Sequence, residues 1–93
     1  MADPRQRQAP PIDFVTFCVS LGSSAFVHLG DAPHPDGGEI LPNLVLAQQT
    51  IDIIGMLQEK TRGNLTEDEA RFLEHLLADL RLRYVTRASG KDG

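Results

Sequence analysis

The chain of 93 residues has a single cysteine, Cys18, and no tryptophan. One cysteine cannot form a disulfide within the chain, so nothing points to an oxidising compartment, and a buried thiol behaves as a small hydrophobic group. The polar start, residues 1–11, precedes an apolar segment that ends at Gly30 and Asp31 without the small-residue pattern of a signal-peptide cleavage site. We therefore expect a cytoplasmic protein.

An excess of basic residues is also lacking, because nine Lys and Arg stand against thirteen Asp and Glu, for a net charge of -4. A protein that binds nucleic acid releases counterions from phosphates with a basic face, and this composition provides none. We therefore expect no nucleic-acid partner. The length suits one small domain, since two halves of such a chain would each bury too little surface to be stable.

Charge is missing altogether from one long segment. From Phe14 to Gly30 there is no Lys, Arg, Asp or Glu, although charged residues make up 24% of the chain. A helix without a charged face is stable only where something covers it on all sides, and a chain of this length has little to cover it with. The identity of the covering partner is therefore the functional question.

Helix start and stop signals predict an all-α fold of three helices, at about 14–29, 44–62 and 67–87. Asp13 and Asn43 are candidate N-caps, Thr66 and Glu69 form a capping box, and Gly30 is a candidate C-cap. We expect residues 1–11 to be a disordered arm, 12–87 a single helical domain and 88–93 a disordered tail. The second and third helices should form an antiparallel hairpin across residues 63–65.

The first helix differs from the other two on a helical wheel, because its apolar residues spread over about 200°. The hairpin can cover one side of such a helix but hardly both. We therefore expect self-association into a homodimer or higher helical bundle, with another protein as a further partner. The predicted oligomer interface consists of Phe14, Phe17, Cys18, Leu21, Gly22, Ala25, Phe26 and Leu29.

A membrane is the first alternative shelter for this helix, which would make the protein a membrane-associated accessory protein. A helix over 14–30 is about 25 Å long, whereas a hydrocarbon core is about 30 Å thick. The segment also contains hydroxyl side chains and lacks flanking Trp or Tyr anchors. These features make a bilayer a poorer host than a second copy of the chain.

Metal binding or catalysis is the second alternative. His28, Asp31 and His34 lie close together in the sequence, with Asp36 and Glu39 following, and all are possible ligands of a divalent metal. Their spacing matches no closed site, and no glycine-rich phosphate-binding motif or catalytic constellation is present. We therefore expect a non-enzymatic interaction or scaffold module with no cofactor and no metal.

The C-terminal end of the third helix is basic and could meet an acidic partner. The predicted partner surface consists of Arg81, Arg83, Tyr84 and Arg87. Bases at a helix C-terminus also complement the helix dipole and are then merely solvated.

Residues spread over all three helices resemble a short bacterial helical family, domain-of-unknown-function family eighteen forty-four. The resemblance covers about residues 12–86. Its most specific part is the junction Glu59-Lys60-Thr61-x-Gly63-Asn64-Leu65-Thr66, and its other parts include Phe14-x-x-Phe17, His28-Leu29-Gly30, Pro33-x-Pro35, Thr50-Ile51-Asp52 and Asp79-Leu80-Arg81-x-x-Tyr84-Val85. It implies a bacterial cytoplasmic protein with no assigned activity and supplies no catalytic residues. It also makes His28, the loop Pro33-His34-Pro35 and Asp52 parts of a pattern.

Overall fold

The computed structural model describes residues 12–33, 37 and 42–90. These form three helices and, in the described ranges, no strand: α2 (Phe14–Leu29), α3 (Leu44–Lys60) and α4 (Glu67–Ala88). The prediction of an all-α fold with three helices is confirmed. The predicted arm, residues 1–11, lies outside the described residues.

Each helix begins at the cap that the sequence indicates. The Asp13 carboxylate accepts the Thr16 amide at 2.7 Å, and this hydrogen bond lowers the pKa of Asp13. At the start of α3, Asn43 accepts the Leu46 amide at 3.0 Å. The capping box of α4 is complete, with the Thr66 hydroxyl accepting the Glu69 amide at 3.1 Å and the Glu69 carboxylate accepting the Thr66 amide at 2.8 Å.

Two helix ends differ slightly from the prediction. Helix α3 ends at Lys60 rather than 62, because the Arg62 amide donates to the Glu59 carbonyl at 3.4 Å, three residues back instead of four, and Gly63 then takes the left-handed conformation with φ 87°. Helix α4 continues through Ala88, which the sequence places in the tail, and the Ser89 hydroxyl donates to the Thr86 carbonyl at 3.0 Å just beyond it. Residues 91–93 of the predicted tail lie outside the described part.

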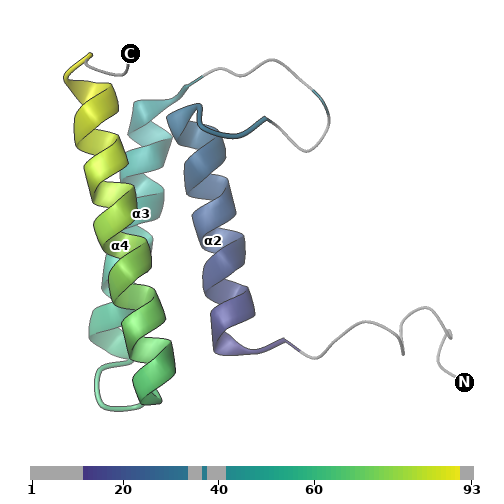
Figure 1. The fold of residues 1–93 in the computed structure, drawn as a ribbon, viewed down its shortest axis with the longest axis vertical. Coiled ribbons are helices and arrows are strands. Elements are labelled where there is room, and N and C mark those ends of the chain that lie inside the picture. Colours follow the sequence, from purple (N-terminus) through teal and green to yellow (C-terminus); the bar gives the residue numbers. More distant parts are fainter. Residues whose placement is uncertain (1–11, 34–36, 38–41, 91–93) are drawn as a thin grey trace, which may run out of the picture.

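The three helices pack side by side, with α2 and α4 running in one direction and α3 in the other (Figure 1). Each helix contacts both of the others. The core between them is almost entirely apolar: Cys18, Ala25 and Leu29 of α2, Ala47, Ile51 and Ile54 of α3, and Leu73, Leu77 and Leu80 of α4 are at most 2% exposed. Phe14, Leu21, Phe26, Leu44, Leu57, Leu65, Phe72, Leu76 and Tyr84 pack around it.

The base of the α2–α3 connection is closed by two contacts. Gly30 ends α2 in the left-handed conformation, with φ 85°, and a Cβ at this position would lie 2.7 Å from Cγ of Pro42. The amide of Asn43 donates to the carbonyl of His28 at 2.7 Å. The end of α2 and the start of α3 are therefore held directly against each other.

Candidate interaction surfaces

The residues of α2 that we predicted at an oligomer interface fall into two groups, and the first group is buried within the chain. Cys18, Ala25 and Leu29 are 0% exposed, and Gly22 is buried against α4, where a Cβ would lie 3.0 Å from Cδ1 of Leu76. Their 4-3-4 spacing makes one stripe that faces the core. Helices α3 and α4 of the same chain therefore cover these four residues.

The second group lies at the edges of the core or outside it. Phe14, Leu21 and Phe26 are half-buried and pack against the core cluster. Phe17 is 43% exposed. Of the predicted interface residues, Phe17 is thus the one with the most surface left to offer a partner.

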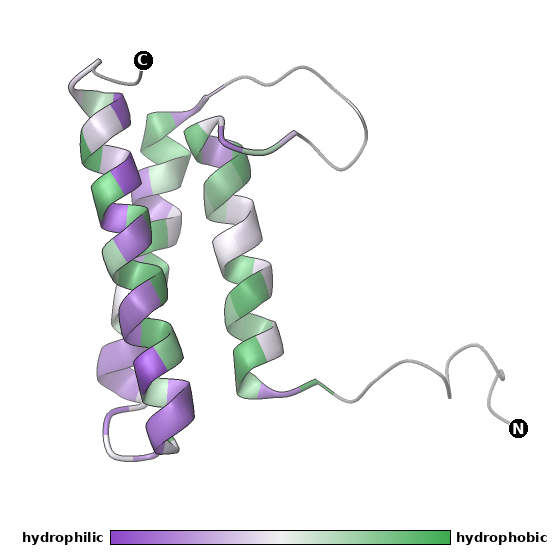
Figure 2. Ribbon diagram, in the orientation of Figure 1, coloured by the Kyte–Doolittle hydropathy of each residue, from purple (hydrophilic) through white to green (hydrophobic). Residues whose placement is uncertain are grey.

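The outward side of α2 is exposed and carries no charge. We call it the uncharged face and define it by Thr16, Phe17, Val19, Ser20, Ser23 and Ser24, all of which are exposed. Coloured by hydropathy, α2 is mostly green and pale, whereas α4 alternates green with deep purple (Figure 2). Helices that face water normally carry charged groups on the outer side, so this face is unusual for a final, solvent-facing surface.

Helix α3 extends the uncharged face with a row of exposed apolar side chains. Leu46, Ile53 and Met56 are 39%, 40% and 56% exposed, and their spacing of seven and three places them on one side of the helix. Arg81 of α4 approaches α3 at Gly55, on the opposite side of that helix. The row therefore lies on the flank of α3 that faces away from α4.

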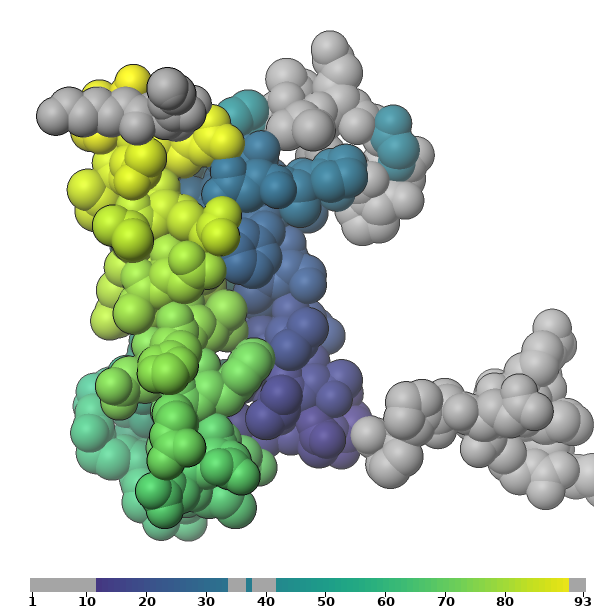
Figure 3. Space-filling model, in the orientation of Figure 1, coloured from purple at the N-terminus to yellow at the C-terminus, as the bar shows by residue number. Residues whose placement is uncertain are grey.

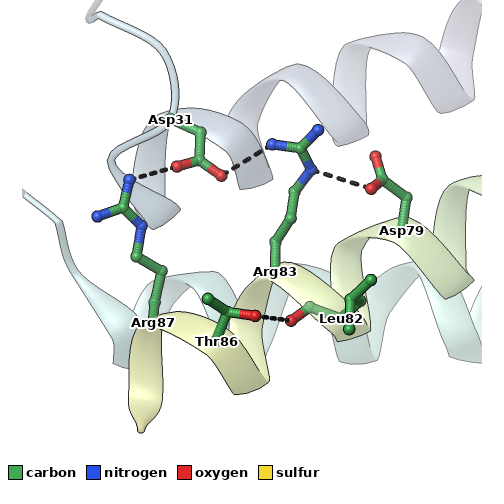
Figure 4. A network of polar contacts seen from close by, with 6 residues as sticks. All are labelled: Asp31, Asp79, Leu82, Arg83, Thr86 and Arg87. Carbon is green, nitrogen blue, oxygen red and sulfur yellow. Dashed lines mark hydrogen bonds and ion pairs between the residues drawn. The ribbon is translucent and has the colours of Figure 1, made fainter. Parts of the chain in front are cut away.

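The predicted partner surface on α4 is divided by a polar network, which we call the aspartate clasp (Figure 4). Asp31, just after α2, accepts Arg83 Nη1 at 3.1 Å and Arg87 Nη2 at 2.6 Å. Arg83 also donates through Nε to Asp79 at 3.0 Å. Two of the predicted partner arginines, Arg83 and Arg87, are thus engaged within the chain.

The surroundings of Asp31 favour its charged form. Its side chain is 15% exposed. Burial raises the pKa of the carboxyl, but the hydrogen bonds and positive charges of Arg87 and Arg83 outweigh burial and lower the pKa overall. The hydrogen bonds of Arg83 to Asp31 and Asp79 raise the pKa of its guanidinium, which also lies 5.0 Å from the centre of the Phe26 ring.

The clasp has a structural role, because it joins the C-terminal ends of α2 and α4. In the space-filling view the yellow end of α4 lies directly against the blue end of α2 (Figure 3). Tyr84, also predicted at the partner surface, is half-buried and packs on the core. Of the predicted set, Arg81 and Arg83 are exposed, but Arg83 belongs to the clasp.

The candidate metal ligands are only partly within the described residues. Asp31 is occupied by two guanidinium groups, and the His28 carbonyl accepts the Asn43 amide. His34 lies outside the described part, as do Asp36 and Glu39. Across residues 12–33, 37 and 42–90 no three His, Cys, Asp or Glu side chains come together in a group that could hold a metal ion.

The part of the chain that the structure describes contains no segment that could span a membrane. Helix α2 has 16 residues, and none of the described helices is both long enough and apolar enough to cross a bilayer. The free thiol of Cys18 lies in the core, and burial raises its pKa, with the negative charge of Glu69 adding to the effect.

The structure has a groove between α3 and α4 that the sequence did not predict. It has a volume of about 480 Å³. Its lining residues are Gln58, Arg62, Gly63, Leu65, Ala70, Leu73, Glu74, Leu77, Ala78 and Arg81. Beside it α4 exposes Leu82 by 67% and Val85 by 62%. The signal in the sequence was the position of these two apolar residues, which lie off the core-facing stripe of α4 on a helical wheel.

No curated protein and no solved structure matches the chain. The profile of one protein family matches residues 11–86, which include all of α2 and α3 and all but the last two residues of α4. This confirms the resemblance found in the sequence. The chain therefore belongs to the family described as Domain of unknown function (DUF1844).

Proposed function

We propose that this protein is a non-enzymatic helical interaction module of the bacterial cytoplasm that self-associates, as a homodimer or higher bundle, through the uncharged face of α2. The observation that carries the proposal is the exposure of six neighbouring residues on α2 without one charge among them. Exposed apolar residues of α3 widen this face. Phe17 and Val19, together with the row on α3, form exposed apolar surface of the kind that marks sites of interaction in soluble proteins.

The absence of charge also favours a second copy over a different partner. In a two-fold symmetric dimer the same surface patch contacts itself, so a patch with a net charge would repel its copy. The chain has a net charge of -4, yet the uncharged face contributes nothing to it. Phe17 supplies an aromatic side chain, the type enriched at the centres of interfaces, and the serines let a facing helix come close.

Light scattering after gel filtration, repeated over a range of protein concentrations, tests self-association. We expect a defined oligomer for the wild type and a shift toward the monomer for Phe17→Glu and for Ile53→Glu, since each places a charge in the interface. Both side chains are partly exposed, so circular dichroism should show folded variants. Leu82→Glu on α4 is the matched control and should leave the oligomer intact.

Two outcomes would overturn the proposal. A wild-type protein that is monomeric at every concentration would remove self-association. A wild-type protein that aggregates without lipid and sediments with phosphatidylglycerol vesicles, while Phe17→Glu does not, would replace the second copy with a bilayer surface.

A further inference from the structure

A second row of exposed apolar side chains lies on the outer side of α4. Ala78, Leu82 and Val85 are all exposed, and their spacing of four and three places them on one side of the helix. This row is on the side of α4 away from the core residues Leu77 and Leu80. It borders the groove between α3 and α4, of which Ala78 is itself a lining residue.

Two charged groups at the same place have no partner among the described residues. Most charged side chains in the described part have one, such as Glu67 with Arg71 or Asp79 with Arg83. Glu74 and Arg81, by contrast, make no hydrogen bond or ion pair with any residue that the structure describes. Both line the groove.

Arg81 is placed over the groove by the backbone of α3. Its Nη2 atom lies only 3.2 Å from the position that a Cβ would take at Gly55. Any side chain at this position would compete with the guanidinium for space. Gly55 therefore allows Arg81 to lie across α3, where its guanidinium N–H groups can donate hydrogen bonds to a ligand in the groove.

The spacing of the charged and apolar side chains at the groove suits a helical partner. Glu74 and Arg81 are seven residues apart, which is about 10.5 Å along a helix axis at about 1.5 Å per residue. The row of Ala78, Leu82 and Val85 matches the i, i+4, i+7 pattern by which helices pack against one another. Gly63, Ala70 and Ala78 leave room for a partner backbone at the groove. An acidic residue at the groove and the net charge of -4 disfavour a polyanion such as RNA.

We propose that the groove between α3 and α4 binds an amphipathic helix of another protein, with its apolar stripe against Leu82 and Val85, an acidic side chain opposite Arg81 and a basic one opposite Glu74. This inference rests on the proposed role as an interaction module but not on self-association, because the site lies on a different side of the bundle from the uncharged face. The protein would then act as an adaptor with two separate faces.

Titration of the full-length, ¹⁵N-labelled protein with synthetic helical peptides tests this site. Two peptides of about 18 residues, or about five turns, share one apolar stripe. The first carries Glu and Lys seven residues apart at the edge of the stripe, and the second carries Lys at both positions. We expect the first peptide to bind about fivefold more tightly, the ratio for one rim ion pair, and to shift the amide signals of residues 55–63 and 70–85.

Charge reversal identifies the residue responsible. Arg81→Glu should abolish or invert the preference between the two peptides, whereas Arg71→Glu, the same charge change on the same helix outside the groove, should leave it unchanged. Equal binding of both peptides, or signal shifts confined to the uncharged face, would overturn the inference. So would shifts at the groove that appear when the protein alone is concentrated, because a second copy would then occupy the groove. Tight binding of an oligouridine that depends on Arg81 would replace the helix with a nucleic acid. Loss of oligomerisation in Phe17→Glu with peptide binding intact would separate the two proposals.

Discussion

Replacing Asp31 with asparagine is the sharpest test of how the ends of α2 and α4 are joined. Asn keeps the size of the side chain and one acceptor oxygen but loses the charge that binds two guanidinium groups. Hydrogen bonds to charged groups contribute about 1.5–3 kcal/mol each when sheltered, and exposed ion pairs contribute about 0–1 kcal/mol. Arg83 is 43% exposed and Arg87 is 28% exposed, so both bonds lie nearer the lower range.

We therefore expect Asp31→Asn to lower the free energy of unfolding by about 2 kcal/mol at pH 7. In a domain of this size such a change lowers the melting temperature by about 10 °C. Urea unfolding followed by circular dichroism measures the loss. Asp79→Asn is the matched control, because it removes a carboxylate from the same Arg83 but only within one helix, and should cost about 0.5 kcal/mol or less.

The dependence on pH provides the decisive measurement. The pKa of Asp31 is lowered in the folded protein, so its stabilisation is complete above the ordinary Asp value of about 3.9 and is lost as the pH falls through the lower folded value. The difference between wild type and Asp31→Asn should thus be constant from about pH 5 to 8 and shrink below about pH 4. A difference that persists at pH 2.5, or none at pH 7, would refute the clasp as a source of stability.

Three further substitutions or reactions test other parts of the structure. Gly30→Ala should destabilise the fold by about 2 kcal/mol or more in urea unfolding, because the new Cβ meets Pro42. Gly63→Ala is the control and should cost about 1 kcal/mol, since φ is 87° there but a Cβ would have no atom within 4 Å. Equal losses would contradict the contact with Pro42. Thr66→Ala should cost about 1 kcal/mol in the same assay through loss of the capping box, and no loss would mean that the box is not formed in solution. Cys18 is 0% exposed, so the native protein should react with a thiol reagent such as Ellman's reagent only through opening of the fold; equal rates in native buffer and in denaturant would contradict its burial.

Local signals in the sequence predicted the helices closely. The bounds of α2 match residues 14–29, and α4 begins at residue 67, because Asp13, Gly30 and the pair Thr66 and Glu69 act through hydrogen bonds within one turn. Such bonds depend only on neighbouring residues, which a sequence displays directly. The predicted end of α3 was two residues too late, because the backbone turns more tightly at Arg62, whose amide donates to the Glu59 carbonyl.

The surfaces were harder to predict, because they depend on which helices meet and at what height. A wheel shows that α2 is apolar over much of its circumference, but not that Cys18 and Ala25 face the core while Phe17 faces outward. Nor does it show that Asp31 meets Arg83, which follows 52 residues later. Both facts depend on the packing of all three helices, and packing separated Arg81 from the other arginines of the predicted partner surface.

The closed base of the α2–α3 connection has a consequence for how the chain tolerates change. The amide of Asn43 donates to the carbonyl of His28, and Gly30 fits against Pro42, so both ends of the intervening segment are fixed by contacts outside it. Lengthening a loop whose ends are already held together costs only about 0.6 kcal/mol of closure entropy for each doubling. The segment between Pro33 and Pro42 is therefore the place where insertions can accumulate during evolution, or a reporter can be introduced, while the three helices keep their arrangement.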